Sequence, residues 1–244
     1  MSKIVNRTME CFETFGREKR PLSLTDLAKA LDIPASSCHD VVRALEERGY
    51  LYEVRPRSGY YPTARLFELA KTIVENDPVA LRAEPVLERL SAALNASVFL
   101  SKGKGTQLTY LLVCGSRDPL RFMVSVGDTV RSLYSTSAGK AFLAGFPPQE
   151  RKAMVSDMNL TPFTRSTITS KKALLKDLEK GEARGWFINR EESVEDALTI
   201  SARVAWNGST YVLTAASTIK RMERQLNSAA KALLAAASEL RRSE

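Results

Sequence analysis

The sequence contains one histidine, three cysteines and no apolar run that approaches the roughly 18 residues of a membrane-spanning helix. Its cysteines, Cys11, Cys38 and Cys114, lie far apart without a C-x-x-C pair, which argues against a disulfide framework or a zinc site. The first residues, MSKIVNRTMECF, are too polar for a signal peptide. We therefore expect a cytoplasmic protein with no membrane partner, no metal site and no cofactor.

Groups for catalysis are equally scarce. The single histidine, His39, lies near the N-terminus, so the rest of the chain has no Ser-His-Asp or Cys-His pair. Glu191 and Glu192 are adjacent, with Asp196 close by, and neighbouring residues on a strand point to opposite faces of the sheet. Gly103 and Gly105 fit a hairpin turn because no helix follows them. We expect no catalytic residues and no enzyme.

Positive charge is present, but it is unevenly distributed. The formal net charge is +8, from 36 Lys and Arg against 28 Asp and Glu. Residues 1–77 hold 12 residues of each sign, so the excess lies entirely in the remainder. If the N-terminal part binds DNA, it must use locally placed arginines and not a general positive field.

The N-terminal part reads as a helix, a helical pair and a short hairpin. Apolar spacing predicts a helix over residues 4–15, and Thr25 is expected to cap a second helix that Ile33-Pro34 ends. A third helix follows, with its apolar residues at offsets 0, 3, 4 and 7, and Gly49 ends it. Residues 50–54 and 59–61 are the arms of a hairpin. This order predicts a winged helix-turn-helix.

The third helix would present small and polar residues on its outer side. Such a face can enter a DNA major groove, which is about 12 Å wide, and the hairpin tip can reach the phosphate backbone. The candidate DNA contacts are Ala35, Ser36, Ser37, His39, Asp40, Arg43, Arg55 and Arg57. The alternative is a small helical subdomain whose polar face is merely solvated. Asp40 favours that alternative, because phosphates repel a carboxylate unless it accepts a hydrogen bond from cytosine or orients Arg43.

The remainder alternates helices and strands. A linker helix is expected over residues 64–77, and then strands over 96–102, 108–114, 120–126, 186–189, 198–206 and 211–217. Helices are expected over 79–94, from Ser137, over 147–158, over 170–184 before Gly185, and from Lys220 to the end. We expect an α+β fold with a DNA-binding domain at 1–63, a linker at 64–77 and, over 78–244, an antiparallel sheet flanked by helices.

Three segments in the same order resemble the IclR family of bacterial transcriptional regulators. They are SLTDLAKALDIPASSCHDVVRALEERGYL, VGDTVRSLYSTSAGKAFLAGF and EARGWFINREESVEDALTISARV. The resemblance implies a GAF-like effector-binding domain after the linker helix. It also implies a homo-oligomer, a dimer or a dimer of dimers, and a small organic acid, in some members aromatic, as effector.

Carried over position by position, the resemblance implies an effector pocket. It would be lined by Leu120, Met123, Arg131, Ser137, Ala138, Gly139, Asn189, Ala197, Thr199, Ala215 and Ser217. Asn189 replaces a frequent acid, Thr199 a frequent cysteine and Ala215 a common serine, so the effector of other members should not be transferred. Asp40 likewise replaces a common basic residue in the DNA reader. Arg131 either pairs with an acidic ligand or is a solvated loop arginine.

The expected function is a ligand-responsive regulator, repressor or activator, of a catabolic operon. A dimer would place two recognition helices in successive major grooves of a pseudo-palindromic operator. An effector that binds one of two states of the protein more tightly than the other would shift the equilibrium between them and so change the affinity for DNA. The alternative is a winged-helix regulator whose C-terminal domain only oligomerises and senses no ligand.

Overall fold

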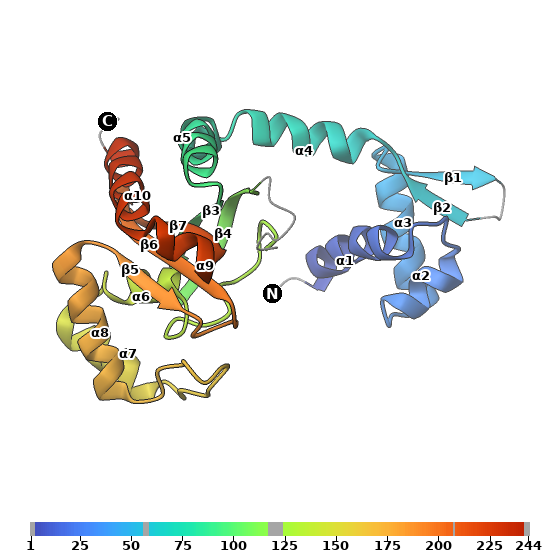
Figure 1. Cartoon of the computed structure of the whole chain (residues 1–244). Coiled ribbons are helices and arrows are strands. Elements are labelled where there is room, and N and C mark those ends of the chain that lie inside the picture. The colour runs from blue at the N-terminus through green and yellow to red at the C-terminus, as the bar shows by residue number, and fades with distance from the viewer. Residues whose placement is uncertain (1–2, 56–58, 117–123, 207, 242–244) are drawn as a thin grey trace. The chain divides into compact units, whose positions relative to one another are not determined.

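The computed structural model describes residues 3–55, 59–116, 124–206 and 208–241. The chain folds as two compact units, Met1–Asp77 and Pro78–Glu244 (Figure 1). None of the helices in the described ranges is both long enough and apolar enough to cross a membrane.

The first unit is a winged helix-turn-helix followed by one further helix. Its elements are α1 (Lys3–Glu18), α2 (Leu24–Ala30), α3 (Ala35–Glu47), β1 (Leu51–Arg55), β2 (Gly59–Pro62) and α4 (Arg65–Glu75). β1 and β2 form an antiparallel hairpin, and Tyr60 of β2 also exchanges two backbone hydrogen bonds with Leu22. The core of this unit consists of Cys11, Phe15, Leu22, Leu27, Leu31, Cys38, Val42, Leu45 and Leu51. The predicted order of elements is confirmed.

The expected cap of α2 is wrong by two residues. Ser23, not Thr25, is the N-cap: its hydroxyl accepts a hydrogen bond from the Asp26 N–H at 3.1 Å, and the Asp26 carboxylate accepts one from the Ser23 N–H at 3.1 Å. This reciprocal pair is a capping box, and it places Thr25 inside the first turn. Asp32, with φ of +49°, turns the chain between the two helices, and Pro34 precedes the first residue of α3.

In the described residues, the second unit is a five-stranded antiparallel sheet with helices on both faces. Its elements are α5 (Pro78–Leu94), β3 (Ser97–Lys104), β4 (Gln107–Cys114), α6 (Ser137–Leu143), α7 (Pro148–Asp157), α8 (Lys171–Arg184), β5 (Phe187–Arg190), β6 (Ala197–Trp206), β7 (Ser209–Thr218), α9 (Ile219–Arg224) and α10 (Leu226–Arg241). The strand order is β4-β3-β7-β6-β5. The α+β class is confirmed.

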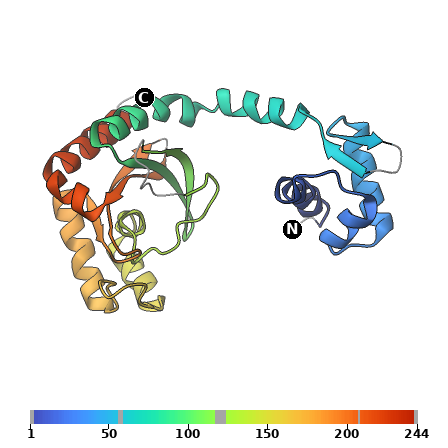
Figure 2. The ribbon, with the colours of Figure 1, turned by 45° about the vertical axis from the view of Figure 1, so that its right-hand side comes forward.

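Two separate apolar cores lie on the two faces of this sheet. On one face, α5, α9 and α10 pack against residues such as Val98, Leu198 and Ala215 (Figures 1 and 2). On the other, α6, α7 and α8 surround a core that includes Phe142, Leu178 and Val212. Because strand side chains alternate, the neighbours Val212 and Leu213 of β7 belong to different cores.

Two expected elements differ from the structure. Part of the strand expected at 120–126 lies outside the described residues, and residues 124–126 lead into a turn at Gly127, whose φ is +91°. The chain then returns along the edge of β4, where the Val130 N–H donates to the Leu108 carbonyl. The expected C-terminal helix is two helices, because Gln225 leaves helical geometry and its side-chain amide donates to the Leu94 carbonyl that ends α5.

Candidate functional site

The outer surface of α3 carries the residues expected to contact DNA, and a groove lies on each side of it. Ala35, Ser36, His39, Asp40 and Arg43 are exposed, and Ser37 is half-buried. Ser37 and Asp40 line a groove of about 490 Å³ that α3 forms with α1. His39 and Arg43 lie on the other side, in a groove of about 390 Å³ shared with Tyr60 of β2.

Charges on this surface are locally paired. The Arg43 guanidinium lies 2.8 Å from the Glu47 carboxylate one turn along α3, and the His39 imidazole lies 3.9 Å from the Asp40 carboxylate. Arg55 is exposed at the end of β1, and Arg57 lies outside the described residues. An exposed i, i+4 pair contributes about 0.3–0.5 kcal/mol, so phosphate or a base edge can draw Arg43 away from Glu47 at little cost.

A cavity of about 250 Å³ lies on the sheet face that α6 covers. Its lining residues are Phe99, Tyr110, Val124, Arg131, Thr136, Ser137, Ala138, Asn189, Ser193, Val194, Thr199, Thr214 and Ala216. Five of the expected pocket residues are therefore brought together: Arg131, Ser137, Ala138, Asn189 and Thr199. The volume is near the lower end of small-molecule sites, which suits a metabolite of few atoms.

Four other expected pocket residues, all within the described ranges, do not line this cavity. Leu120 and Met123 lie outside the described residues, and Gly139 and Ala197 are buried outside its wall. The assignment of Ala215 and Ser217 is wrong. Ala215 belongs to the core under α5 and α10, and Ser217 pairs with Leu198 of that same core, so both face away from the cavity. Their neighbours Thr214 and Ala216 line it instead, a displacement of one residue along β7.

Hydroxyl groups form a continuous chain between α6 and the sheet. The Ser137 hydroxyl, at the start of α6, lies 2.6 Å from the Thr199 hydroxyl and 2.8 Å from that of Ser201. The Ser201 hydroxyl in turn lies 2.8 Å from that of Thr214. Because each hydroxyl both donates and accepts, this chain can reorient to meet either kind of group on a ligand.

The orientation of the Asn189 side-chain amide is fixed by its neighbours. Its oxygen accepts a hydrogen bond from the Glu192 N–H at 2.7 Å, and its nitrogen donates to the Ser193 hydroxyl at 2.8 Å. A backbone N–H can only donate, so the assignment of oxygen and nitrogen is unambiguous. The amide nitrogen keeps one further N–H with which to meet an acceptor.

Arg131 lies at the exposed edge of the cavity and stacks on an aromatic ring. Its guanidinium is 4.8 Å from the centre of the Phe163 ring, and Phe163 stacks at 5.9 Å on Tyr134. In the described part of the chain, no ion pair involves Arg131. On the inner wall, burial and then the Asp128 carboxylate raise the pKa of the Tyr110 phenol, which therefore stays neutral. Among the described residues, the cavity thus offers the Arg131 cation, neutral hydroxyls and aromatic edges.

Residues in the loop after β5 were missed as cavity walls. Ser193 and Val194 reach the cavity from this loop, and Phe99 and Tyr110, an edge-to-face pair at 5.6 Å, reach it from β3 and β4. Side chains alternate between the two faces of a strand, so the sequence of β3 could have indicated Phe99 as a cavity residue. The sequence gives no signal for the fold of residues 191–196.

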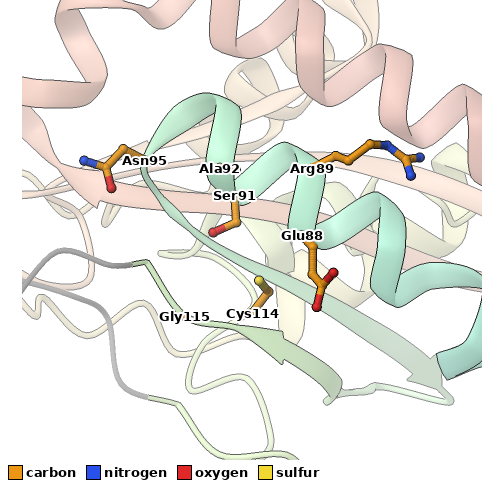
Figure 3. A pocket seen from close by; sticks show the side chains of 7 residues that line it. All are labelled: Glu88, Arg89, Ser91, Ala92, Asn95, Cys114 and Gly115. Atoms are coloured by element: carbon orange, nitrogen blue, oxygen red, sulfur yellow. The ribbon is translucent and has the colours of Figure 1, made fainter.

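A larger cavity, of about 810 Å³, lies between α5 and the end of β4 (Figure 3). It is lined by Glu88, Arg89, Ser91, Ala92, Asn95, Cys114 and Gly115. Two of its polar groups have structural partners: the Ser91 hydroxyl donates to the Ala96 carbonyl, and the Arg89 guanidinium pairs with Glu239 of α10. Because its polar groups do not converge, this cavity is the weaker candidate.

Two families of domains were matched along the chain. The helix-turn-helix domain of the IclR family matches residues 5–55, and the C-terminal domain of the bacterial transcriptional regulator IclR matches residues 71–242. The second match alone covers more than half of the sequence.

The chain belongs to the IclR family of bacterial transcriptional regulators.

Relatives in the IclR family are distant in sequence and close in fold. The HTH-type transcriptional regulator BhcR of Paracoccus denitrificans is 27% identical over 222 residues, which cover 90% of this chain and 79% of that protein. The crystal structure of the Thermotoga maritima IclR superposes with a TM-score of 0.80 at 21% identity, covering 98% of this chain and 97% of that one. An IclR homologue from Microbacterium hydrocarbonoxydans, crystallised with 4-hydroxybenzoate, gives 0.76 at 20% identity, with 98% of each chain covered.

Membership of the IclR family makes the protein a transcriptional regulator and not an enzyme, as predicted. The adjacent carboxylates Glu191 and Glu192 are placed differently from the expectation. Glu191 and Glu192 lie in the loop after β5, not on a strand; Glu191 has a φ of +58°, and the Glu192 carboxylate pairs with buried Lys140. Gly105 lies in the tight turn between β3 and β4, as expected.

Proposed function

We propose that this regulator is a cytoplasmic, ligand-responsive transcription factor that controls a catabolic operon. In this proposal it binds a pseudo-palindromic operator as a dimer or tetramer, and a small organic acid in the 250 Å³ cavity changes its DNA affinity. The observation that carries the proposal is the wall of that cavity, where Arg131 and a neutral hydroxyl chain surround a small space with aromatic sides. A cation facing neutral donors suits a carboxylate.

The ligand part is tested by calorimetry on the full chain with a panel of small acids, among them benzoate, 4-hydroxybenzoate and pyruvate. Arg131→Ala should weaken binding of any acid that binds, because it removes the cation at the cavity edge. Arg165→Ala is the matched control, since it removes another exposed arginine that does not line the cavity. Unchanged affinity in Arg131→Ala would make Arg131 a solvated loop residue.

The DNA part rests on α3 and its arginines. α3 begins after Pro34 without a side-chain cap, which leaves first-turn N–H groups for a phosphate, and Arg43 is held by a weak pair. In anisotropy titrations with DNA from the promoter region beside its own gene, Arg43→Ala should cost about 1–3 kcal/mol of specific binding. Arg48→Ala, at the far end of α3, is the control.

Salt dependence tests the same interface in another way. Because the first 77 residues are neutral overall, few arginines can neutralise phosphates, and each contributes about −0.9 to the slope of log affinity against log salt. We expect a slope of only a few units. A slope near −10 would require a general positive field that this unit does not have.

Self-association is supported by exposed apolar residues on two helices of the first unit. Ile4, Val5 and Met9 are 69%, 60% and 56% exposed on α1, and Phe67, Ile73 and Val74 are 66%, 61% and 56% exposed on α4. Such faces are typical of protein interfaces. Sedimentation of the wild type should give a dimer or tetramer, and Phe67→Ser with Ile73→Ser should shift it toward the monomer.

A regulator whose second unit only oligomerises is the competing proposal. A ligand that binds the folded state raises the unfolding midpoint by mass action. A thermal-shift screen in which no acid raises the midpoint would favour the competing proposal, and would leave the DNA results unaffected.

A further inference from the structure

A fully buried lysine lies directly behind the cavity. Lys140 of α6 is 0% exposed, and its ammonium contacts carboxylates from two other elements. It lies 2.8 Å from the Asp177 carboxylate of α8 and 2.5 Å from that of Glu192, in the loop after β5. It also donates to the Ile188 carbonyl of β5 at 3.2 Å. One side chain therefore joins α6, α8, β5 and this loop.

Stability alone does not account for this cluster. Burial raises the pKa of the Glu192 carboxyl even though the Lys140 charge and hydrogen bond lower it, so the desolvation penalty is not fully offset. Apolar residues of similar volume often stabilise such a position equally well or better. A buried ion pair differs from apolar packing because it is directional: it holds two elements in one arrangement.

The elements held by this pair are two walls of the cavity. On one side, Ser137 and Ala138 of the same short helix line the cavity within one turn of Lys140. On the other, the Glu192 backbone N–H donates to Asn189, and the adjacent Ser193 accepts from Asn189. The Lys140–Glu192 pair thus connects the wall formed by α6 to the wall that includes Asn189.

A second set of contacts fixes the same loop from outside. The Thr167 hydroxyl donates to the Glu192 carbonyl at 2.7 Å, and the Thr164 hydroxyl donates to the Glu191 carbonyl at 2.6 Å. Both threonines lie in the segment between α7 and α8, which also contains Phe163 beneath Arg131. The loop is therefore held on both sides, with Glu192 as its buried anchor.

We propose that Lys140 and Glu192 are positioning residues of the effector cavity. Their ion pair holds residues 191–196 against α6, sets the separation of the two cavity walls, and orients the Asn189 amide so that its remaining N–H meets an acceptor atom of the ligand. Only the statement about the ligand rests on the proposed function.

Hydrogen–deuterium exchange of the full chain tests this proposal without any ligand. In Glu192→Gln, which keeps the shape of the side chain and removes its charge, amides in residues 190–196 should exchange at least about tenfold faster. Amides of β3 and α10 should keep their wild-type rates. The double variant Lys140→Met with Glu192→Gln, which leaves no unpaired Lys140 charge, should give the same local result if Glu192→Gln alone fails to fold.

The matched control is Arg151→Met. Arg151 of α7 is also buried, at 7% exposure, and its guanidinium pairs with Glu182 of α8, away from the cavity. This variant should not accelerate exchange in residues 190–196. Wild-type rates in that loop for Glu192→Gln and the double variant, or equal acceleration of β3 and α10, would overturn the positioning role.

A calorimetric measurement links the loop to recognition. With 4-hydroxybenzoate as probe, Glu192→Gln should weaken binding by about tenfold, whereas Arg151→Met should not change it. Unchanged affinity in Glu192→Gln would overturn the link between the loop and the ligand. Absence of binding to the wild type would count against the proposed ligand class, while the exchange rates still decide the positioning role.

Discussion

Replacing Gly139 by alanine should displace the start of α6 and with it one wall of the cavity. A Cβ atom at this position would lie 2.3 Å from the Leu133 Cα and 2.6 Å from the Leu133 carbonyl carbon and oxygen. Ordinary contacts begin near 3.4 Å, so the helix and the Leu133 backbone must separate by about 1 Å. Main-chain atoms cannot rotate away as a side chain does. Overpacking of this kind costs about 1–3 kcal/mol.

Thermal unfolding of the full chain measures this cost. For a unit of this size, about 1–3 kcal/mol corresponds to a midpoint lowered by roughly 2–12 °C. Gly115→Ala is the matched control, because a Cβ there meets nothing within 4 Å and its backbone φ is not positive. Equal midpoints for Gly139→Ala and Gly115→Ala would refute the close approach of α6 to Leu133.

Three further predictions concern other parts of the chain. Ser23→Ala should lower the free energy of unfolding of the first unit by about 1 kcal/mol, because it removes the α2 cap, whereas Thr25→Ala should change it much less. Urea unfolding followed by circular dichroism measures both variants, and equal losses would contradict the capping box. Glu192 faces Lys140 and Asp177, and its pKa is raised, so its contribution to stability is complete below its ordinary pKa of 4.5 and is lost as pH rises through the folded value. The free energy of unfolding of Glu192→Gln, relative to that of the wild type, should therefore increase from pH 4 to pH 7. A difference between the two proteins that does not vary with pH would count against the raised pKa. Burial, and then Cys38, raise the pKa of the Cys11 thiol to about 12, so a thiol reagent at pH 8 should label Cys11 in urea and not in the native protein, as mass spectrometry of the labelled peptides would show.

Periodicity predicted the helix-turn-helix well because α1, α2 and α3 each bury one side. In α3, Cys38, Val42 and Leu45 are buried while the opposite side is exposed, so the sequence carries the contrast that periodicity needs. The cap of α2 was misplaced because Ser23 and Thr25 are equally good caps by residue type. Only the carboxylate of Asp26, three residues after Ser23, distinguishes them.

The second unit was harder to predict where both faces of an element are buried. Ala215 and Ala216 are both buried in β7, an inner strand of the sheet, and nothing in their chemistry indicates which one faces α6. Without a contrast between a buried and an exposed face, an assignment that is off by one residue places the side chains of the strand on the wrong face of the sheet. All residues of α6 are buried, Lys140 included. A lysine is ordinarily expected at the surface, and only its carboxylate partners explain its burial here.

The alternation of β6 and β7 also bears on how such a regulator can change its ligand. Thr199 and Thr214 reach the cavity, whereas their neighbours Leu198 and Leu213 pack beneath α5 and α10. Under the proposed function, recognition and folding are therefore encoded by different positions of the same strands. A lineage can exchange the cavity-facing residues one at a time and acquire a response to a new metabolite, while the side chains that keep the protein folded stay as they are.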